Sequence, residues 1–309
     1  TNEMNNIEQI NPMMCDSETG ICEIPGTLTP GNAINTAAKQ NKIRILYFTD
    51  PICSSCWGIE PQLRKLKLEY GEYFDIEYRM GGLLKGWDVY GGKDVSGPAS
   101  VAQHWEEASD YYDMPIDGDL WIEDPLASSY PPSIAFKAAQ MQGKVKADLF
   151  LRKIKEMVFL EKKNISKWEH LEQAAIEVGL DSVKFKADFD GAANTAFEDD
   201  LALARQLGVR GFPTIFFTDK DDNRFKVYGS KPYEVYEQAL LKLNPAAVKK
   251  SIDTSLTSLF NHYSTFTTKE IAVLTGQTVE AAEASLQLLN NQNKISKTDT
   301  KKGVLWRKI

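Results

Sequence analysis

Two things that this 309-residue sequence lacks narrow the classes of protein to which it can belong. No run of apolar residues approaches 18, the length at which a stretch is read as a membrane-spanning helix, so we expect no membrane span and no membrane partner. The first 26 residues have no apolar core of the kind that a secretory signal carries. We therefore expect a cytoplasmic protein.

Cysteine and histidine are both scarce, and this bears on disulfides and on metal binding. Four cysteines in a chain of this length do not resemble the disulfide framework of a small secreted protein. The three histidines, His104, His170 and His262, are far in sequence from the cysteines. Because a structural zinc ion normally takes four Cys or His ligands, we expect no metal site, and no cofactor is indicated. Zinc held jointly by two cysteine pairs stays open as an alternative.

Cys53-Ser-Ser-Cys56 is the most informative segment that the sequence does contain. It follows residues 42–49, which are rich in β-branched and aromatic residues as in a buried strand, and Asp50-Pro51 ends that strand. The two cysteines therefore lie where a strand leads into a helix, and the positive end of the helix dipole favours a thiolate there. We expect Cys53 to be the nucleophile and Cys56 to resolve the mixed disulfide. A structural disulfide is the alternative, although so short a loop gains little from closure.

Gly211-Phe212-Pro213-Thr214 is a second informative segment, because it directly precedes the strand-like run 215–218. Pro213 is a candidate cis proline, and the backbone of Gly211 and Phe212 before it would pair with an extended peptide substrate. Cys53 and Pro213 are 160 positions apart. The interval predicts helices, since apolar residues recur at three- and four-residue spacing in five segments, 101–112, 132–142, 147–160, 167–178 and 193–207.

Residues 47–61 and 78–83 resemble the DsbA family of thioredoxin-fold proteins, particularly its FrnE-like dithiol-disulfide isomerases. The first segment spans the cysteine pair, the second reads Tyr-Arg-Met-Gly-Gly-Leu, and Pro61 matches the proline that kinks the first helix of thioredoxins. The resemblance implies an α/β thioredoxin-like fold over residues 41–245, with a large helical insertion at about 98–207. It also implies a thiol-disulfide oxidoreductase or isomerase that acts on protein or small-molecule thiols and disulfides.

The resemblance also suggests roles for residues around the cysteines. Glu60 is implied as a proton acceptor during resolution, with a solvated helix glutamate as the alternative. Trp57 and other nearby aromatic residues would line a substrate groove, with core packing as the alternative. The Ser-Ser dipeptide supplies neither a histidine charge nor a proline constraint, so we expect a potential less oxidising than the about −120 mV of the strong periplasmic oxidant.

The first 40 residues are polar and contain several prolines and glycines, which predicts an irregular extension outside the sheet. This extension holds Cys15 and Cys22. They form either a local disulfide with each other or a second redox pair that exchanges with Cys53 and Cys56. Mass mapping under non-reducing conditions distinguishes a bonded pair from two free thiols.

Residues 246–309 look like a separate module. Helical patterns at 252–262, 268–274 and 279–290 are followed by a predicted hairpin formed by 294–296 and 304–308, an order typical of a winged helix. The module holds nine Lys/Arg against five Asp/Glu, whereas residues 1–245 are strongly acidic. Because the third helical pattern carries Glu280 and Glu283, which would meet phosphates poorly, we expect packing or a protein partner at this module rather than nucleic acid.

Four segments that span both modules resemble the YjbH (SpxH) proteins, which are DsbA-like adaptors that deliver a transcription regulator to the ClpXP protease. These segments are 124–129, 136–140, 268–272 and 303–306. The resemblance makes an adaptor, a protein that binds other proteins, the alternative function. The amino-terminal segment of that family is typically rich in His and Cys and can bind zinc, whereas residues 1–40 here hold two cysteines and no histidine.

Overall fold

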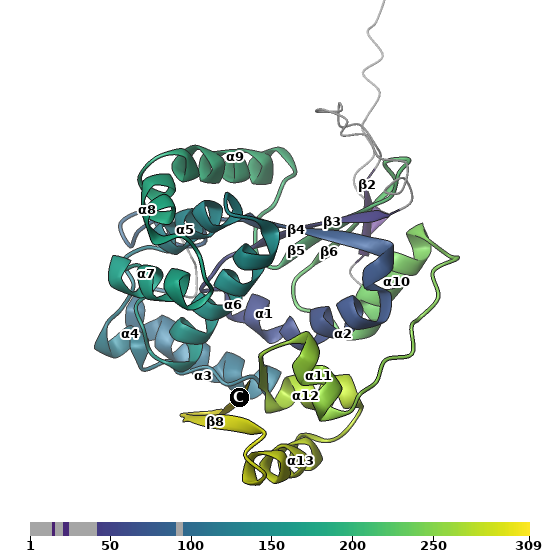
Figure 1. The fold of residues 1–309 in the computed structure, drawn as a ribbon. Coiled ribbons are helices and arrows are strands. Elements are labelled where there is room, and N and C mark those ends of the chain that lie inside the picture. Colours follow the sequence, from purple (N-terminus) through teal and green to yellow (C-terminus); the bar gives the residue numbers. More distant parts are fainter. Residues whose placement is uncertain (1–13, 16–20, 25–41, 91–94) are drawn as a thin grey trace, which may run out of the picture.

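The computed structural model describes residues 14–15, 21–24, 42–90 and 95–309. Its main body is a six-stranded sheet with strand order β1-β2-β6-β5-β3-β4, in which β3 and β4 are parallel and the other neighbours are antiparallel (Figure 1). The strands are β1 (Met14–Cys15), β2 (Ile21–Ile24), β3 (Ile43–Thr49), β4 (Phe74–Met80), β5 (Thr214–Thr218) and β6 (Arg224–Tyr228).

The central strands β3 and β5 are apolar because both faces of the sheet are covered. On one face Ile43, Ile45 and Tyr47 join the main core, and on the other Phe48 and Phe216 pack edge to face. Helices α2 (Glu60–Tyr70) and α10 (Tyr233–Leu243) pack against each other on the first face, and α9 (Ala192–Gln206) covers the second (Figure 1). A near-continuous apolar run is the pattern expected of a strand that is buried on both sides.

A large group of helices is inserted between β4 and β5. It consists of α3 (Pro98–Tyr112), α4 (Leu120–Glu123), α5 (Tyr130–Gln140), α6 (Lys144–Leu160), α7 (Trp168–Glu177), α8 (Ser182–Asp190) and α9. Five of these match the helices predicted from apolar spacing, with ends shifted by a few residues, while α4 and α8 were not predicted. No helix among the residues that the structure describes is long and apolar enough to cross a membrane.

The amino-terminal segment differs from the prediction of an irregular extension. Strand β2 pairs antiparallel with β6, and β1 pairs with β2 so that the backbone of Cys15 lies opposite that of Cys22. The physical reason is that β6 would otherwise end the sheet with unpaired backbone N–H and C=O groups, which a further strand satisfies. The side chains of both cysteines lie outside the described residues, so their disulfide or redox role stays a prediction.

The C-terminal module has its own apolar core, built around Phe266 and Trp306. It contains α11 (Leu256–His262), β7 (Thr265–Thr267), α12 (Thr268–Thr275), α13 (Val279–Asn291), β8 (Ile295–Thr300) and β9 (Gly303–Lys308). The three helices and the β8–β9 hairpin agree with the predicted patterns, and β7 adds a strand that was not predicted. The order of the sheet is β7-β9-β8. The winged-helix interpretation stays a prediction.

Several contacts attach this module to the main body, both at α12 and at the β8–β9 hairpin. Helix α12 packs against α2, and Leu68 of α2 reaches the core of the module. At the hairpin turn, Lys301 and Lys302 form ion pairs with Glu106 and Asp110 of α3. The module therefore lies directly against α2, the helix that follows the cysteine pair in the sequence (Figure 1).

Candidate functional site

Cys53 and Cys56 lie where β3 leads into α1 (Ser54–Gly58), as the sequence predicts. Cys53 is the N-cap residue of α1, and its Sγ accepts a hydrogen bond from the backbone N–H of Cys56 at 3.2 Å. Both cysteines are free thiols. Cys53 retains 5% of its surface exposed and Cys56 retains none, so Cys53 is the sulfur that a substrate can reach.

A cavity of about 190 Å³ lies over Cys53. Its walls come from α1, from the segment after β4, from α3 and α4, and from the loop before Pro213. Most of the lining is apolar and aromatic, and the aromatic members are Trp87, Tyr90, Trp105, Trp121 and Phe212. The cavity therefore offers an apolar surface beside a single accessible thiol.

Phe212 and Pro213 place the second predicted segment at this site. The Phe212–Pro213 peptide bond is cis, and Phe212 lines the same cavity as Cys53. Gly81 leaves room for the Phe212 ring, because a Cβ atom at that position would lie 1.9 Å from a ring carbon of Phe212. Gly211 is also partly exposed beside Tyr228. Gly81 is part of segment 78–83, which carries the family resemblance, but nothing in the sequence indicates that it lies against the Phe212 ring.

The two thiols differ in pKa, and in the opposite sense to the prediction. Burial, followed by the hydrogen bond and charge of Cys56, raises the pKa of the Cys53 thiol well above its ordinary value. Burial also opposes ionisation of Cys56, but the hydrogen bond from Cys53 and the positive charge of Lys155 outweigh it and lower the pKa of that thiol. Early ionisation of Cys53 therefore stays a prediction, and in this state the buried helix end and the nearby cation favour Cys56 as the thiolate.

Glu60 is not a solvated helix glutamate, and it is poorly suited to accept a proton. Its Oε1 accepts a hydrogen bond from Lys155 Nζ at 2.8 Å, and Arg152 Nη1 lies 3.8 Å from Oε2. Burial would raise the pKa of this carboxyl, but Lys155, Arg152 and Arg64 outweigh it and lower the pKa to about 2. The expected role as proton acceptor is therefore wrong. Glu60 instead holds Lys155 in its buried position.

Asp50 is a second carboxyl group near the cysteines, and the sequence did not indicate it as a proton acceptor. Its carboxylate has no exposed surface and accepts hydrogen bonds from the backbone of Leu83 and Ile52 and from the Ser129 hydroxyl. Burial exceeds the effect of these donors and raises the pKa of Asp50 to about 6. One feature of the sequence could have predicted this buried acid: an Asp lies three positions before Cys53, at the end of a strand buried on both faces.

Trp57 does not contact a substrate. Its side chain has no exposed surface, its indole N–H donates to the Pro115 carbonyl at 3.1 Å, and its ring stacks on Phe159. The expected binding role is therefore wrong, and the alternative of core packing describes this residue. Three aromatic residues further along the chain, Trp87, Tyr90 and Trp105, do line the cavity over Cys53.

One cluster in the described part of the chain has the spacing of a metal site. Oxygen atoms of Glu106, Asp117 and Asp119 lie within 4.8 Å of one another. However, the ammonium group of Lys301 donates to Glu106 at 2.7 Å and to Asp119 at 2.8 Å. A lysine already supplies the positive charge that these carboxylates attract.

A free dithiol at a helix start, a cis proline segment beside it and this mixed sheet with inserted helices define a thioredoxin-fold protein. A family model described as thioredoxin matches residues 46–238. The chain is 35% identical to the ClpXP adapter protein SpxH of Halalkalibacterium halodurans, over 96% of this chain and 97% of that protein. It is 32% identical to the ClpXP adapter protein SpxH of Bacillus subtilis, over 87% of this chain and 90% of the relative. The chain therefore belongs to the SpxH family of thioredoxin-fold proteins.

A solved structure agrees at the level of the fold. The cytosolic disulfide reductase DsbM of Pseudomonas aeruginosa superposes with a TM-score of 0.52 at 22% identity, covering 65% of this chain and 99% of that one. The predicted thioredoxin-like α/β fold with a DsbA-like helical insertion is confirmed. The resemblance to the YjbH (SpxH) proteins is confirmed, and the resemblance to the DsbA family is confirmed at the level of the fold, whereas the FrnE-like subfamily stays a prediction.

Proposed function

We propose that the protein is an adaptor that delivers a protein partner to the ClpXP protease. The observation that carries this proposal is the 35% identity to a named ClpXP adapter along nearly the whole length of both chains, which includes the C-terminal module. The oxidoreductase favoured by the cysteine pair alone thus becomes the second candidate. An adaptor needs two protein-binding surfaces, and the C-terminal module, held firmly on α2 and α3, supplies a surface beyond the thioredoxin body.

A degradation assay with purified ClpXP tests the adaptor. The substrate is the transcription regulator that the resemblance to YjbH (SpxH) proteins implies, and its loss is followed on gels with and without the full chain. We expect the chain to accelerate degradation at least severalfold at substoichiometric amounts, because an adaptor is reused. A variant with Cys53→Ala and Cys56→Ala is the matched control and should keep the acceleration, since delivery makes and breaks no disulfide. An unchanged rate with the wild-type chain would rule out the adaptor.

Thiol-disulfide exchange is the second candidate, and the accessible Cys53 thiol in an apolar cavity favours it. Cys53 passes its proton to the Cys56 thiolate and attacks one sulfur of a substrate disulfide, which releases the other sulfur as a thiolate. Cys56 then gives up that proton to the first released sulfur and attacks the Sγ of Cys53, which releases the second substrate sulfur as a thiolate. The dithiol is thereby oxidised to a disulfide, and the substrate is reduced to one thiol and one thiolate, which takes its proton from water. We propose that Asp50, a buried carboxyl three positions before Cys53 with a pKa of about 6, carries the proton of Cys56 to the first released sulfur. Gly211, Phe212 and Pro213 are proposed to hold the substrate backbone.

Insulin reduction and a glutathione titration test this chemistry. We expect turnover by the wild type, loss of turnover in Cys53→Ala, and a potential below the about −120 mV of the strong periplasmic oxidant. Ser285→Ala, at a partly exposed position of α13 (Val279–Asn291) in the C-terminal module, is the control and should leave turnover unchanged. Absence of turnover in the wild type would rule out catalysis by the dithiol. A potential near −120 mV would contradict the expectation, drawn from the Ser-Ser dipeptide, that the pair is less oxidising than the strong periplasmic oxidant.

A further inference from the structure

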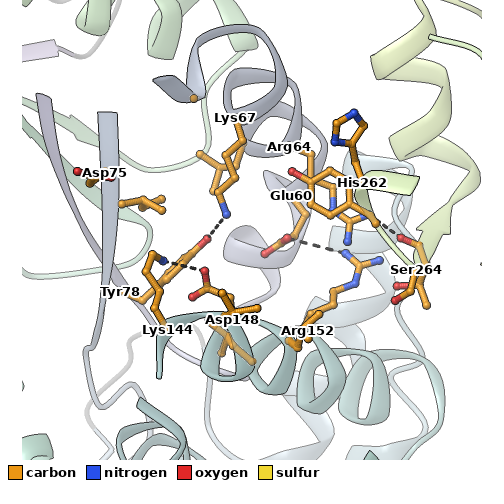
Figure 2. Close-up of a pocket in the computed structure, with 18 of the residues that line it drawn as sticks. Glu60, Arg64, Lys67, Asp75, Tyr78, Lys144, Asp148, Arg152, His262 and Ser264 are labelled. Atoms are coloured by element: carbon orange, nitrogen blue, oxygen red, sulfur yellow. Dashed lines mark hydrogen bonds and ion pairs between the residues drawn. The ribbon is translucent and has the colours of Figure 1, made fainter. Parts of the chain in front are cut away.

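A second and larger cavity, of about 720 Å³, lies away from Cys53, between the main body and the C-terminal module (Figure 2). Its walls come from α2, β4 and α6 on one side and from the end of α11 and the start of β7 on the other. The volume falls in the range of small-molecule sites, which are mostly apolar with a few convergent polar groups.

Most of the charged side chains that line this cavity are already paired. Arg152 donates to Glu270 at 2.7 Å, and Arg64 lies 3.3 Å from the same carboxylate. Lys144 pairs with Asp148 at 2.7 Å. Within the described residues Lys67 forms no ion pair, although it lines the cavity.

Lys67 is directed into the cavity by Tyr78. Its Nζ donates to the buried Tyr78 hydroxyl at 2.7 Å, and Lys144 approaches the same ring at 5.5 Å from the centroid, so two ammonium groups flank one phenol (Figure 2). An ammonium group has three donors and the phenol takes one of them. Among the described residues, Lys67 therefore presents two further donors and a positive charge that is not held in an ion pair.

The remaining wall is apolar and open to a ligand. Val145 and Leu149 lie one turn apart on α6 and are 76% and 46% exposed, although both are large apolar residues. Leu63, Phe74 and Ile76 line the opposite side of the cavity. A ligand that covered Val145 and Leu149 would remove apolar surface from water, which is favourable, whereas Leu63, Phe74 and Ile76 are already buried.

We propose that this cavity binds a small amphipathic carboxylate, with its negative group on Lys67 and its apolar body along Val145 and Leu149. A single charge fits best, because Asp148 and Glu60 line the same cavity and would repel a second one. A phosphate group is bound best by the two parallel N–H donors of a guanidinium group. Arg64 and Arg152, the two arginines that line the cavity, already pair with Glu270. A cationic ligand would meet Lys67 and Lys144.

Calorimetric titration of the full chain with sodium decanoate tests the proposal. We expect saturable binding at one site in the wild type and about tenfold weaker binding in Lys67→Met, since the charged hydrogen bond is lost. Lys65→Met is the matched control. Lys65 lies on the same helix but contacts the Tyr233 ring, and it does not line the cavity, so this variant should bind as the wild type does.

Val145→Asp provides a second variant that does not depend on Lys67. Its side chain is exposed in the first turn of α6, where an acidic residue suits the helix dipole, so the fold should tolerate it. We expect it to weaken decanoate binding through repulsion. Decylamine and decyl phosphate should bind at least tenfold more weakly than decanoate. No saturable binding of decanoate, equal binding of decylamine, or equal effects of Lys67→Met and Lys65→Met would each overturn the proposal.

Discussion

Replacing Glu270 with alanine is expected to lower the free energy of unfolding by about 3–5 kcal/mol. Glu270 has no exposed surface, and its two oxygens accept hydrogen bonds from Arg152 at 2.7 and 3.0 Å. The same carboxylate faces Arg64 and accepts a hydrogen bond from the Thr267 backbone in the capping box of α12. Without it, two guanidinium groups would face each other with reduced compensation, and α12 would lose the Glu270 half of its capping box while Thr267 still caps the helix.

Urea unfolding followed by tryptophan fluorescence measures this change. Glu283→Ala is the matched control, because it makes the same substitution at an exposed position of α13 and should change the free energy of unfolding by less than about 0.5 kcal/mol. Equal stabilities for the two variants would mean that Arg64 and Arg152 find other partners when Glu270 is absent. The ionic cluster would then contribute little to holding the two modules together.

Asp50→Asn is expected to become more stable relative to the wild type as the pH rises, by about 2–3 kcal/mol between pH 4 and pH 8. The pKa of Asp50 is raised in the folded state to about 6, above the ordinary value of 3.8, because the carboxyl is buried. The folded state therefore holds the proton more tightly than the unfolded state. The contribution of Asp50 to stability is complete below about pH 4 and is lost as the pH rises through about 6, whereas asparagine has no proton to lose.

Thermal or urea unfolding of both proteins across this pH range checks the prediction. At pH 4 Asp50 is a neutral carboxyl, and the variant should be slightly less stable, since the amide nitrogen of asparagine cannot accept the backbone hydrogen bond that the hydroxyl oxygen of the acid can still accept. Asp75→Asn, at an exposed position of β4, is the control and should follow the wild type at every pH. A constant difference between Asp50→Asn and wild type would show that this carboxyl titrates normally in the folded protein.

The features that the sequence predicts well are local ones. The Cys53–Cys56 segment, its strand and the loop before Pro213 can be recognised because each is defined by a few consecutive residues. The helices of the insertion follow from apolar spacing within single segments. Strand β2 was missed because four residues among many prolines and glycines carry a weak pattern, and the edge of β6 that they cover is about 200 positions away.

The roles of Glu60 and Trp57 depended on residues far along the chain. Lys155, which fixes the charge of Glu60, and Phe159, which stacks on Trp57, are both on α6, about 100 positions later. Arg64 is one turn away on the same helix, but nothing near position 60 indicates that Lys155 and Arg152 will join it around this carboxyl. The pKa order of the two thiols was missed for the same reason, because Lys155 is a cause of it.

Helix α2 has a consequence for any attempt to divide the protein. One face of α2 packs toward the sheet and α10, and its other side carries Arg64 and Leu68 into contact with the C-terminal module. Cutting the chain near residue 245 would expose Leu68 to water and leave Arg64 without Glu270. The two modules should therefore melt in a single cooperative transition, and the thioredoxin body expressed alone should be prone to aggregation.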